Sequence, residues 1–180
     1  MNSINHEQSE ENYKDLFNEE AVMKIKELCE KAKTCFFCTG IRSGNQFYTR
    51  PMAVQKIDDD GTCWFLSAAD SYKNQEILLD PFIQLLFQAS THSGFVSLYG
   101  EAHITNDKVK IKELWEPLLK TWFTEGEEDP RITVIEFIPE TGYYWDTKHG
   151  RLVAFAKQVA GSILGRTMDD SIEGKLELES

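Results

Sequence analysis

The hydrophobic positions of this chain change their period near residue 34. In residues 10–33, apolar side chains recur at helical spacing among Glu and Lys, which predicts a first helix. Beyond it, short apolar runs are separated by polar turns that contain Gly, Asn and Asp, a pattern typical of strands. The strands that we expect are 34–41, 46–57, 62–68, 82–89, 95–104, 131–138, 142–147 and 150–156. The first three follow one another through tight turns and therefore predict an antiparallel meander.

Two further helices are expected between the strands. Residues 71–79 form a short helix that ends at Asp80-Pro81, because proline cannot continue a helix. Residues 107–123 repeat apolar positions at helical spacing, and Pro117 either kinks this helix or starts a second short one.

The expected strand 131–138 is apolar on both faces. Ile132 and Val134 lie on one face, and Ile135 and Phe137 lie on the other. A closed barrel, a packed helix or a subunit interface would cover the second face. The elements together predict an α+β fold built on a small, mainly antiparallel β-barrel with about seven strands.

Length and charge narrow the class of protein. The chain is long enough for one domain with an ample core, which we place at residues 1–160, followed by a polar tail at 161–180 that we expect to be mobile. The net charge of -11 argues against binding to nucleic acid or an anionic membrane, because both would be repelled. No signal peptide and no apolar run of about 20 residues is visible, so we expect a cytoplasmic protein.

The stretch "CFFC", residues 35–38, matches a pattern found in metal sites and redox dithiols. It lies in an expected strand, where Cys35 and Cys38 point to opposite faces. No second cysteine pair or nearby histidine completes a zinc site. We therefore predict buried free thiols and no metal site.

Basic and hydroxyl groups gather at the start of the helix 71–79. Ser71 stands at its N-cap and Lys73 two positions later, where free backbone N–H groups favour an anion. With the turn at 58–61 centred on Asp59-Asp60, Arg50 falls roughly opposite residue 69 on the neighbouring strand. A plain serine cap with a solvated lysine is the alternative, and the converging arginine favours a phosphate site.

These residues belong to recognisable motifs. The stretch "RPMAVQ…DDDGTCWFLSAADSYKNQEI" followed by "VSLYGEAHI" resembles the FMN-binding split barrels of the pyridoxamine 5'-phosphate oxidase superfamily. The stretch "LWEPLLKTWFTEGEEDPRITVIEFIPETGYYWDT" resembles the bacterial general stress protein 26-like branch, with its W-x6-W-F, G-x-x-D-P-R and Y-W-D motifs. The resemblance runs from about Phe36 to Leu152, and it implies a split β-barrel of about six to seven strands, of Greek-key type, with flanking helices.

The resemblance implies a homodimer with FMN at the subunit interface. It assigns the cofactor phosphate to an arginine on the second strand and to a Ser-x-Lys turn. Further residues are expected along the flavin ring or near it, and Trp145 is expected to come from the opposite subunit. The cofactor-binding residues that we predict are Arg50, Pro51, Met52, Ala53, Ser67, Ala68, Ser71, Lys73 and Trp145.

The late part of the chain departs from the true oxidases. Their W-x5-R-L-H-D-R motif reads "WDTKHGRLVAF" here, so Trp145 and Arg151 keep their spacing while Val153 and Phe155 replace the histidine and the last arginine. Phe95 stands near the place of the family's glutamine. Vitamin B6 oxidation is therefore not expected. The residues that the resemblance assigns to the cofactor phosphate, Arg50, Ser71 and Lys73, are all present, and we call them the phosphate clamp.

The sequence leaves two functions open. One is an FMN-dependent oxidoreductase of unknown small-molecule redox substrate, associated with the general stress response. The other is a flavin-binding or carrier protein without turnover. No catalytic residue is assigned, and the contributions of Lys56 and Arg151 to the site stay open.

Overall fold

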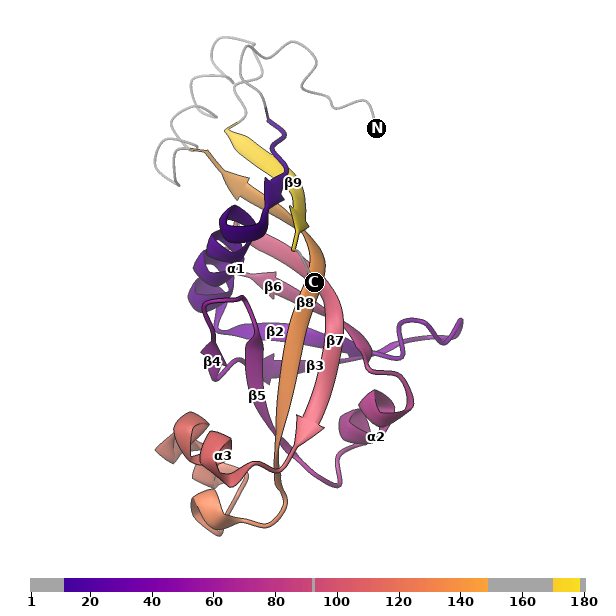
Figure 1. Cartoon of the computed structure of the whole chain (residues 1–180), viewed down its shortest axis with the longest axis vertical. Helices are drawn as coiled ribbons and strands as arrows, with labels where there is room; N and C mark the ends of the chain where they lie inside the picture. Colours follow the sequence, from indigo (N-terminus) through magenta and orange to yellow (C-terminus); the bar gives the residue numbers. More distant parts are fainter. Residues whose placement is uncertain (1–11, 92, 149–169, 179–180) are drawn as a thin grey trace.

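The computed structural model describes residues 12–91, 93–148 and 170–178. Within them the chain forms a mainly antiparallel sheet with three α-helices and two short 3₁₀ helices (Figure 1). The elements in chain order are β1 (Leu16–Phe17), α1 (Asn18–Ala32), β2 (Thr34–Thr39), β3 (Tyr48–Ala53), β4 (Lys56–Ile57), β5 (Cys63–Ala68), α2 (Tyr72–Leu79), β6 (Phe82–Gln88), β7 (Phe95–Thr105), α3 (Lys108–Leu114), η1 (Pro117–Thr121), η2 (Gly126–Glu128), β8 (Ile132–Thr147) and β9 (Ser171–Glu177). The predicted α+β class is confirmed.

The strands pair in the order β1-β9-β8-β7-β6-β2-β3, with β5 beside β8 and β4 beside β5. The sheet curls around α1, which lies along one side, while α2 and α3 lie toward the opposite end from β9 (Figure 1). The expected bounds of β2, α2, β6 and β7 agree with the structure to within two residues. Their strong local signals explain this agreement: short apolar runs between polar turns for the strands, and Ser71 and Asp80-Pro81 at the two ends of α2.

Two apolar clusters hold the fold together, and β8 lies between them. Ile135 and Phe137 face the larger cluster, which α1 and the inner face of the sheet enclose. Ile132 and Val134 face a smaller cluster formed with α3 and the 3₁₀ segment that follows it. All four side chains are buried within one chain. Of the three covers that the sequence left open, the packed helix is the one that the structure shows.

Pro117 starts a new helix instead of kinking the old one. α3 ends at Leu114, and η1 begins at Pro117. This break lets Trp115 and Phe123 both pack on the outer face of β5 and β8, with their ring centroids 6.4 Å apart. Trp115 and Phe123 of the W-x6-W-F motif therefore contribute to the smaller core, whereas Trp122 is exposed.

Three strand predictions were wrong. Residues 46–57 are not one strand. β3 ends at Ala53 and pairs with β2, whereas β4 is a separate short strand that pairs with β5. The expected three-strand meander is therefore absent from the described residues. Residues 131–138 and 142–147 are not separate strands but one long strand, β8, whose irregular pairing near Pro139 replaces the expected turn. The expected strand 150–156 lies outside the described residues.

The ends of the chain differ most from the prediction. The first helix begins at Asn18, and residues 12–17 run extended beside β9. Residues 171–177, which we expected within a mobile tail, form β9 between β1 and β8. Leu176 of this strand is fully buried in the larger cluster. The pairing joins segments far apart in the sequence, so no local pattern reveals it.

Candidate functional site

Arg50 reaches the start of α2 by a route that the sequence did not predict. Its strand β3 pairs with β2, opposite Phe37, and not with the strand that leads to Ser71. The expected register opposite residue 69 is therefore wrong, because the hairpin at 58–61 pairs only β4 with β5. The Arg50 side chain instead extends to α2, where its Nη2 donates to Glu76 Oε2 at 2.7 Å.

The Arg50 guanidinium is held on its protein side by two acceptors. Besides Glu76, Nη1 donates to Thr39 Oγ1 at 2.8 Å, and the Thr39 hydroxyl in turn donates to Glu76 Oε2. Thr39 is fully buried, and about a fifth of the Arg50 and Glu76 side chains is exposed, 22% and 19%. The three side chains therefore form a fixed, charged triad at the edge of the core.

Lys73 lies beside this triad without a protein partner among the described residues, since no hydrogen bond or ion pair reaches its ammonium. Burial lowers the pKa of Lys73, and the nearby Arg50 guanidinium lowers it further. Glu76 and Asp70 act in the opposite direction. Two cations thus face one another with only partial neutralisation, a situation that a bound anion would relieve.

Ser71 occupies the N-cap position of α2 but does not cap it. Its backbone is extended, and its side chain makes no hydrogen bond to the first-turn amides. The first turn also contains no acidic residue. The simple alternative of a serine cap is therefore not what the structure shows, and the positive end of α2 lies open beside Lys73.

A buried polar network through Asn74 and Thr133 holds the side chains of Ser67 and Ser71 in place. Thr133 donates its hydroxyl to the Ser67 carbonyl at 3.0 Å, so its oxygen accepts from Asn74 Nδ2 at 2.9 Å. The Asn74 oxygen consequently turns toward the serines and accepts from Ser67 Oγ at 2.7 Å and Ser71 Oγ at 3.1 Å. Ser67 is 2% exposed, and its hydroxyl is engaged in this network.

The sequence did not identify Thr39, Asn74, Glu76 or Thr133 as part of the site. One signal was available, because asparagine is unfavourable inside a helix unless its amide has a partner. Glu76 stands one helical turn after Lys73, which places both on one face of α2. The partners of these residues come from other strands and could not be read from the sequence.

The other predicted residues are split between two places. Pro51 and Ala53 are exposed on the outer face of β3, whereas Met52 packs against the larger core cluster. Ala68 is half-buried at the end of β5. Because strand neighbours alternate faces, the side chains of residues 51–53 cannot all meet one flat ligand.

Trp145 does not meet Arg50 within one chain. It is exposed on β8, with its ring 4.6 Å from that of Tyr143. The strands β2, β6 and β7 separate it from β3. A site that contains both residues needs a second copy of the chain.

Lys56 is engaged elsewhere. Its ammonium pairs with Asp58 at 2.7 Å and Glu113 at 2.6 Å, which links β4 to α3. The hydrogen bonds that its ammonium donates to both carboxylates raise the pKa of Lys56. Arg151 lies outside the described residues.

The four cysteines are buried free thiols, as predicted. Cys35 belongs to the larger core cluster, while Cys38 lies outside it with Sγ 3.5 Å from Thr49 Oγ1. Burial raises the pKa of the Cys63 thiol to about 12, which disfavours a reactive thiolate.

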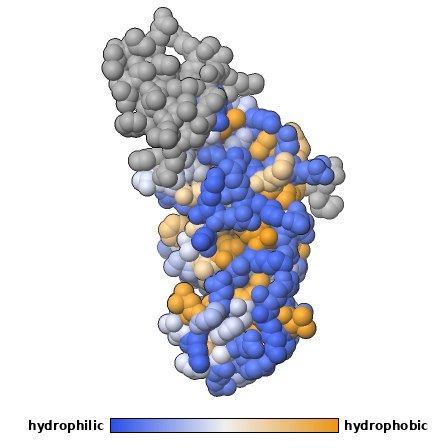
Figure 2. Space-filling model, turned by 90° about the vertical axis from the view of Figure 1, so that its left-hand side faces the viewer, coloured by the Kyte–Doolittle hydropathy of each residue, from blue (hydrophilic) through white to orange (hydrophobic). Residues whose placement is uncertain are grey.

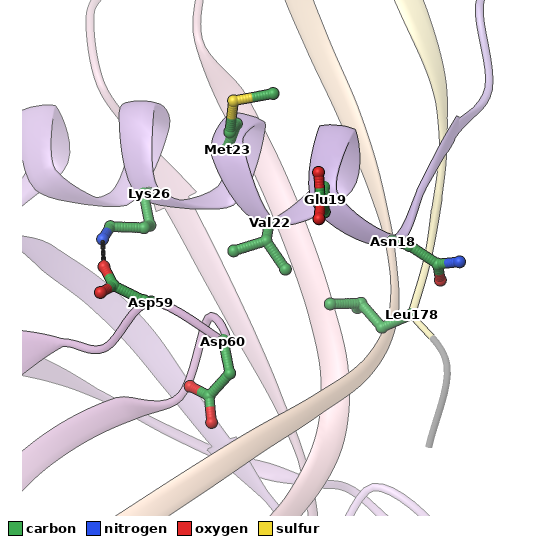
Figure 3. Close-up of a pocket in the computed structure, with 8 residues that line it drawn as sticks. All are labelled: Asn18, Glu19, Val22, Met23, Lys26, Asp59, Asp60 and Leu178. Carbon is green, nitrogen blue, oxygen red and sulfur yellow. Dashed lines mark hydrogen bonds and ion pairs between the residues drawn. The ribbon is translucent and has the colours of Figure 1, made fainter.

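A separate pocket of about 570 Å³ lies between α1, the turn before β5 and the end of β9 (Figure 3). Lys26 and Asp59 form an ion pair across it at 2.5 Å. Its lining contains none of the predicted site residues and consists of Asn18, Glu19, Val22, Met23, Lys26, Asp59, Asp60 and Leu178. With three carboxylates against one ammonium, it disfavours a phosphate. The side of the molecule on which α1 lies mixes hydrophilic surface with several hydrophobic patches (Figure 2).

No helix in the described part of the chain is long and apolar enough to cross a membrane.

Among curated proteins, Protein bli-3 of Neurospora crassa is 28% identical over 127 residues, which is 66% of this chain. The match spans 61% of the length of that relative.

Solved structures share the fold at low sequence identity. A general stress protein 26 described from Jannaschia sp. CCS1 has a TM-score of 0.72 at 20% identity, over 86% of this chain and 96% of that one. General stress protein 26 of Bacillus anthracis str. Sterne has a TM-score of 0.60 at 22% identity, over 68% and 92%. The general stress FMN/FAD binding protein of Xanthomonas citri has a TM-score of 0.61 at 21% identity, over 73% and 92%.

The sequence profile described as "Pyridoxamine 5'-phosphate oxidase like" matches residues 20–169. This range contains β2 to β8 and every residue of the candidate phosphate site. The protein therefore belongs to the pyridoxamine 5'-phosphate oxidase-like family.

Proposed function

We propose that this protein is an FMN-binding flavoprotein and acts as an oxidoreductase. The observation that carries the proposal is the pair of cations at the open start of α2, Arg50 and Lys73, of which Lys73 has no protein partner among the described residues. A phosphate dianion fits such a site, because it would neutralise both cations and accept from the free amides of the helix. The name of the Xanthomonas citri relative supports a flavin as the rest of the ligand.

The residues of the chain would hold and orient the cofactor. Lys73 and Arg50 contact the phosphate, and the network through Asn74 keeps Ser71 beside it. FMN, when bound, supplies the transfer of electrons to or from a small-molecule substrate. We assign no proton donor to a side chain.

Oxidation of pyridoxamine phosphate is not the reaction that we propose. Val153 and Phe155 stand where the oxidases resembled by this sequence carry a histidine and an arginine. Neither replacement can hold a charged pyridoxal substrate. A different substrate, or none, is expected in the stress-related branch that the motifs resemble.

A flavin carrier without turnover is the second candidate. The observation that favours it is the ion pair between Arg50 and Glu76, which competes with a phosphate for the arginine. A carrier has to release its cofactor, and competition for Arg50 would favour release.

Replacement of Lys73 by alanine tests the phosphate clamp. Because a hydrogen bond between charged groups contributes about 1.5–3 kcal/mol, we expect Lys73→Ala to weaken FMN binding about tenfold or more. Riboflavin, which lacks the phosphate, should bind with nearly unchanged affinity. Fluorescence titration measures both, and Lys120→Ala, at an exposed position on η1, is the matched control. Equal losses for the two flavins would show that Lys73 does not contact the phosphate.

Anaerobic reduction separates the enzyme from the carrier. The FMN-loaded protein is mixed with NADH or NADPH, and the flavin absorbance is followed. Repeated bleaching at catalytic rates when an acceptor is added indicates an oxidoreductase. A slow change of one equivalent per flavin indicates a carrier. Absence of flavin absorbance and affinity would contradict both candidates.

We also propose a homodimer with two equivalent flavin sites. The support for it is the distance of Trp145 from Arg50 along the sheet, together with apolar side chains exposed on the outer face of β2 and β6. Each site would combine the clamp of one subunit with the Trp145 side of the other.

A further inference from the structure

The carboxylate of Glu76 contacts Arg50, one of the two cations of the proposed phosphate clamp. It accepts from Arg50 at 2.7 Å and from Thr39, and its charge also acts on Lys73, one helical turn earlier. Only 19% of its side chain is exposed, so water screens its charge weakly. Glu76 is therefore the counter-ion of Arg50, and its charge partly offsets that of Lys73.

A phosphate that contacts both Arg50 and Lys73 would lie close to this carboxylate. The site would then hold two positive charges against three negative ones, two from the phosphate and one from Glu76. Like charges at such a distance repel each other strongly in a partly buried place. Either the ion pair between Arg50 and Glu76 breaks when the phosphate binds, or the phosphate binds in spite of repulsion by the Glu76 carboxylate.

We propose that Glu76 competes with the cofactor phosphate for Arg50 and so makes the flavin exchangeable. This inference rests on the phosphate clamp proposed above and adds its regulation. Binding replaces the Arg50–Glu76 contact with an Arg50–phosphate contact, and release restores it. Thr39 offers Glu76 a partner in both states, because its hydroxyl donates to the carboxylate in the structure.

The substitution Glu76→Gln separates competition from simple support of Arg50. Glutamine keeps the length and an acceptor oxygen but removes the charge, so two cations then meet a dianion. We expect Glu76→Gln to bind FMN about tenfold more tightly or better, since it removes one close repulsion. Riboflavin affinity should stay the same. Glu113→Gln is the matched control, because it removes a carboxylate engaged with Lys56 and Lys110 away from the site.

Thermal unfolding gives a second readout, in which Glu76→Gln should lower the melting temperature of the flavin-free protein and raise the increase caused by FMN. Without flavin, Glu76→Gln should melt below the wild type, because Arg50 loses its ion pair. With saturating FMN, the stabilisation caused by the ligand should be larger in Glu76→Gln than in the wild type. If Glu76 only supported the fold, the substitution would lower both the melting temperature without flavin and the stabilisation by FMN. If Glu76→Gln does not fold, Glu76→Met, of similar size and without charge, is compared in the same way.

The outcomes distinguish this inference from the function on which it rests. Weaker or unchanged FMN binding in Glu76→Gln, while the wild type still prefers FMN to riboflavin, overturns the competition and leaves the clamp intact. If the wild type binds FMN and riboflavin alike, the clamp itself fails and the competition fails with it. Tighter FMN binding with unchanged riboflavin binding supports both.

Discussion

At the scale of single residues, Asp129 and Arg131 form a contact that orders the loop before β8. Arg131 donates to Asp129 from Nε at 3.1 Å, from Nη2 at 2.8 Å and from its backbone N–H at 3.0 Å. The Asp129 side chain is 1% exposed. The Arg131 carbonyl accepts from Ala69 N at 2.7 Å, which joins this loop to the segment that precedes α2. The G-x-x-D-P-R motif therefore supports the candidate site from outside it.

This pair predicts a specific loss of stability in acid. Hydrogen bonds from Arg131 lower the pKa of Asp129 to about 2, whereas an unfolded aspartate titrates near about 3.9. A lowered pKa contributes stability above the unfolded value, and that contribution disappears as the pH falls from about 4 to about 2. Asp129→Asn keeps the acceptor oxygen but does not titrate. It should therefore be less stable than the wild type at neutral pH.

Urea unfolding of both proteins between neutral pH and pH of about 2 measures this difference. We expect the gap between wild type and Asp129→Asn to narrow below about pH 4. A gap that stays constant down to pH of about 2 would show that the ionised carboxylate contributes nothing.

At the scale of elements, β9 is the least expected part of the fold. It pairs with β8 through its whole length and with β1 in parallel. Leu176 lies opposite Gly142 and enters the larger core cluster. A side chain on Gly174 would meet the Lys14 carbonyl oxygen at 1.8 Å, so the chain segments approach closely here. The strand is thus built into the domain.

Truncation of Leu176 tests this role. Leu176→Ala should lower the free energy of unfolding by roughly 2–5 kcal/mol, as expected for a fully buried leucine. Glu177→Ala, on the next and exposed position, should change it by less than about 0.5 kcal/mol. Urea unfolding gives both values. Equal, negligible effects would mean that residues 171–177 behave as the mobile tail that the sequence predicts.

At the scale of the whole molecule, the two apolar faces of β8 do not require a partner subunit, because α3 and η1 cover the second face. The outer face of the sheet still exposes Phe36 by 57% and Leu86 by 38%, and Phe36 lies opposite both Pro51 and Leu86 in the strand register. An apolar surface beside the predicted flavin residues is suited to an interface with a second copy.

Light scattering tests the dimer. At low micromolar concentration we expect a mass near twice 20.7 kDa. Phe36→Asp should shift the mass toward the monomer and weaken flavin binding, because a charge would be buried in the interface. Leu118→Asp, at an exposed position on η1, should do neither. A monomeric wild type that holds FMN would contradict both the dimer and the shared site.

The local pattern of the sequence predicted those elements whose causes are local. Short apolar runs between polar turns predicted β2, β6 and β7, and Ser71 and Asp80-Pro81 predicted the ends of α2. The opposite faces of Cys35 and Cys38 followed from the alternation of side chains along a strand. The convergence of Arg50 and Lys73 was also anticipated, although through a strand pairing that does not exist.

Only the tertiary structure decided which segments meet. It placed β9 beside β1, covered the second face of β8 with α3, and gave Arg50 the partners Thr39 and Glu76. The hydrophobic periodicity of the sequence predicts none of these contacts, because each joins segments that are distant along the chain. Local periodicity states which face of an element is buried, whereas the identity of its neighbour is set by the packing of the whole chain.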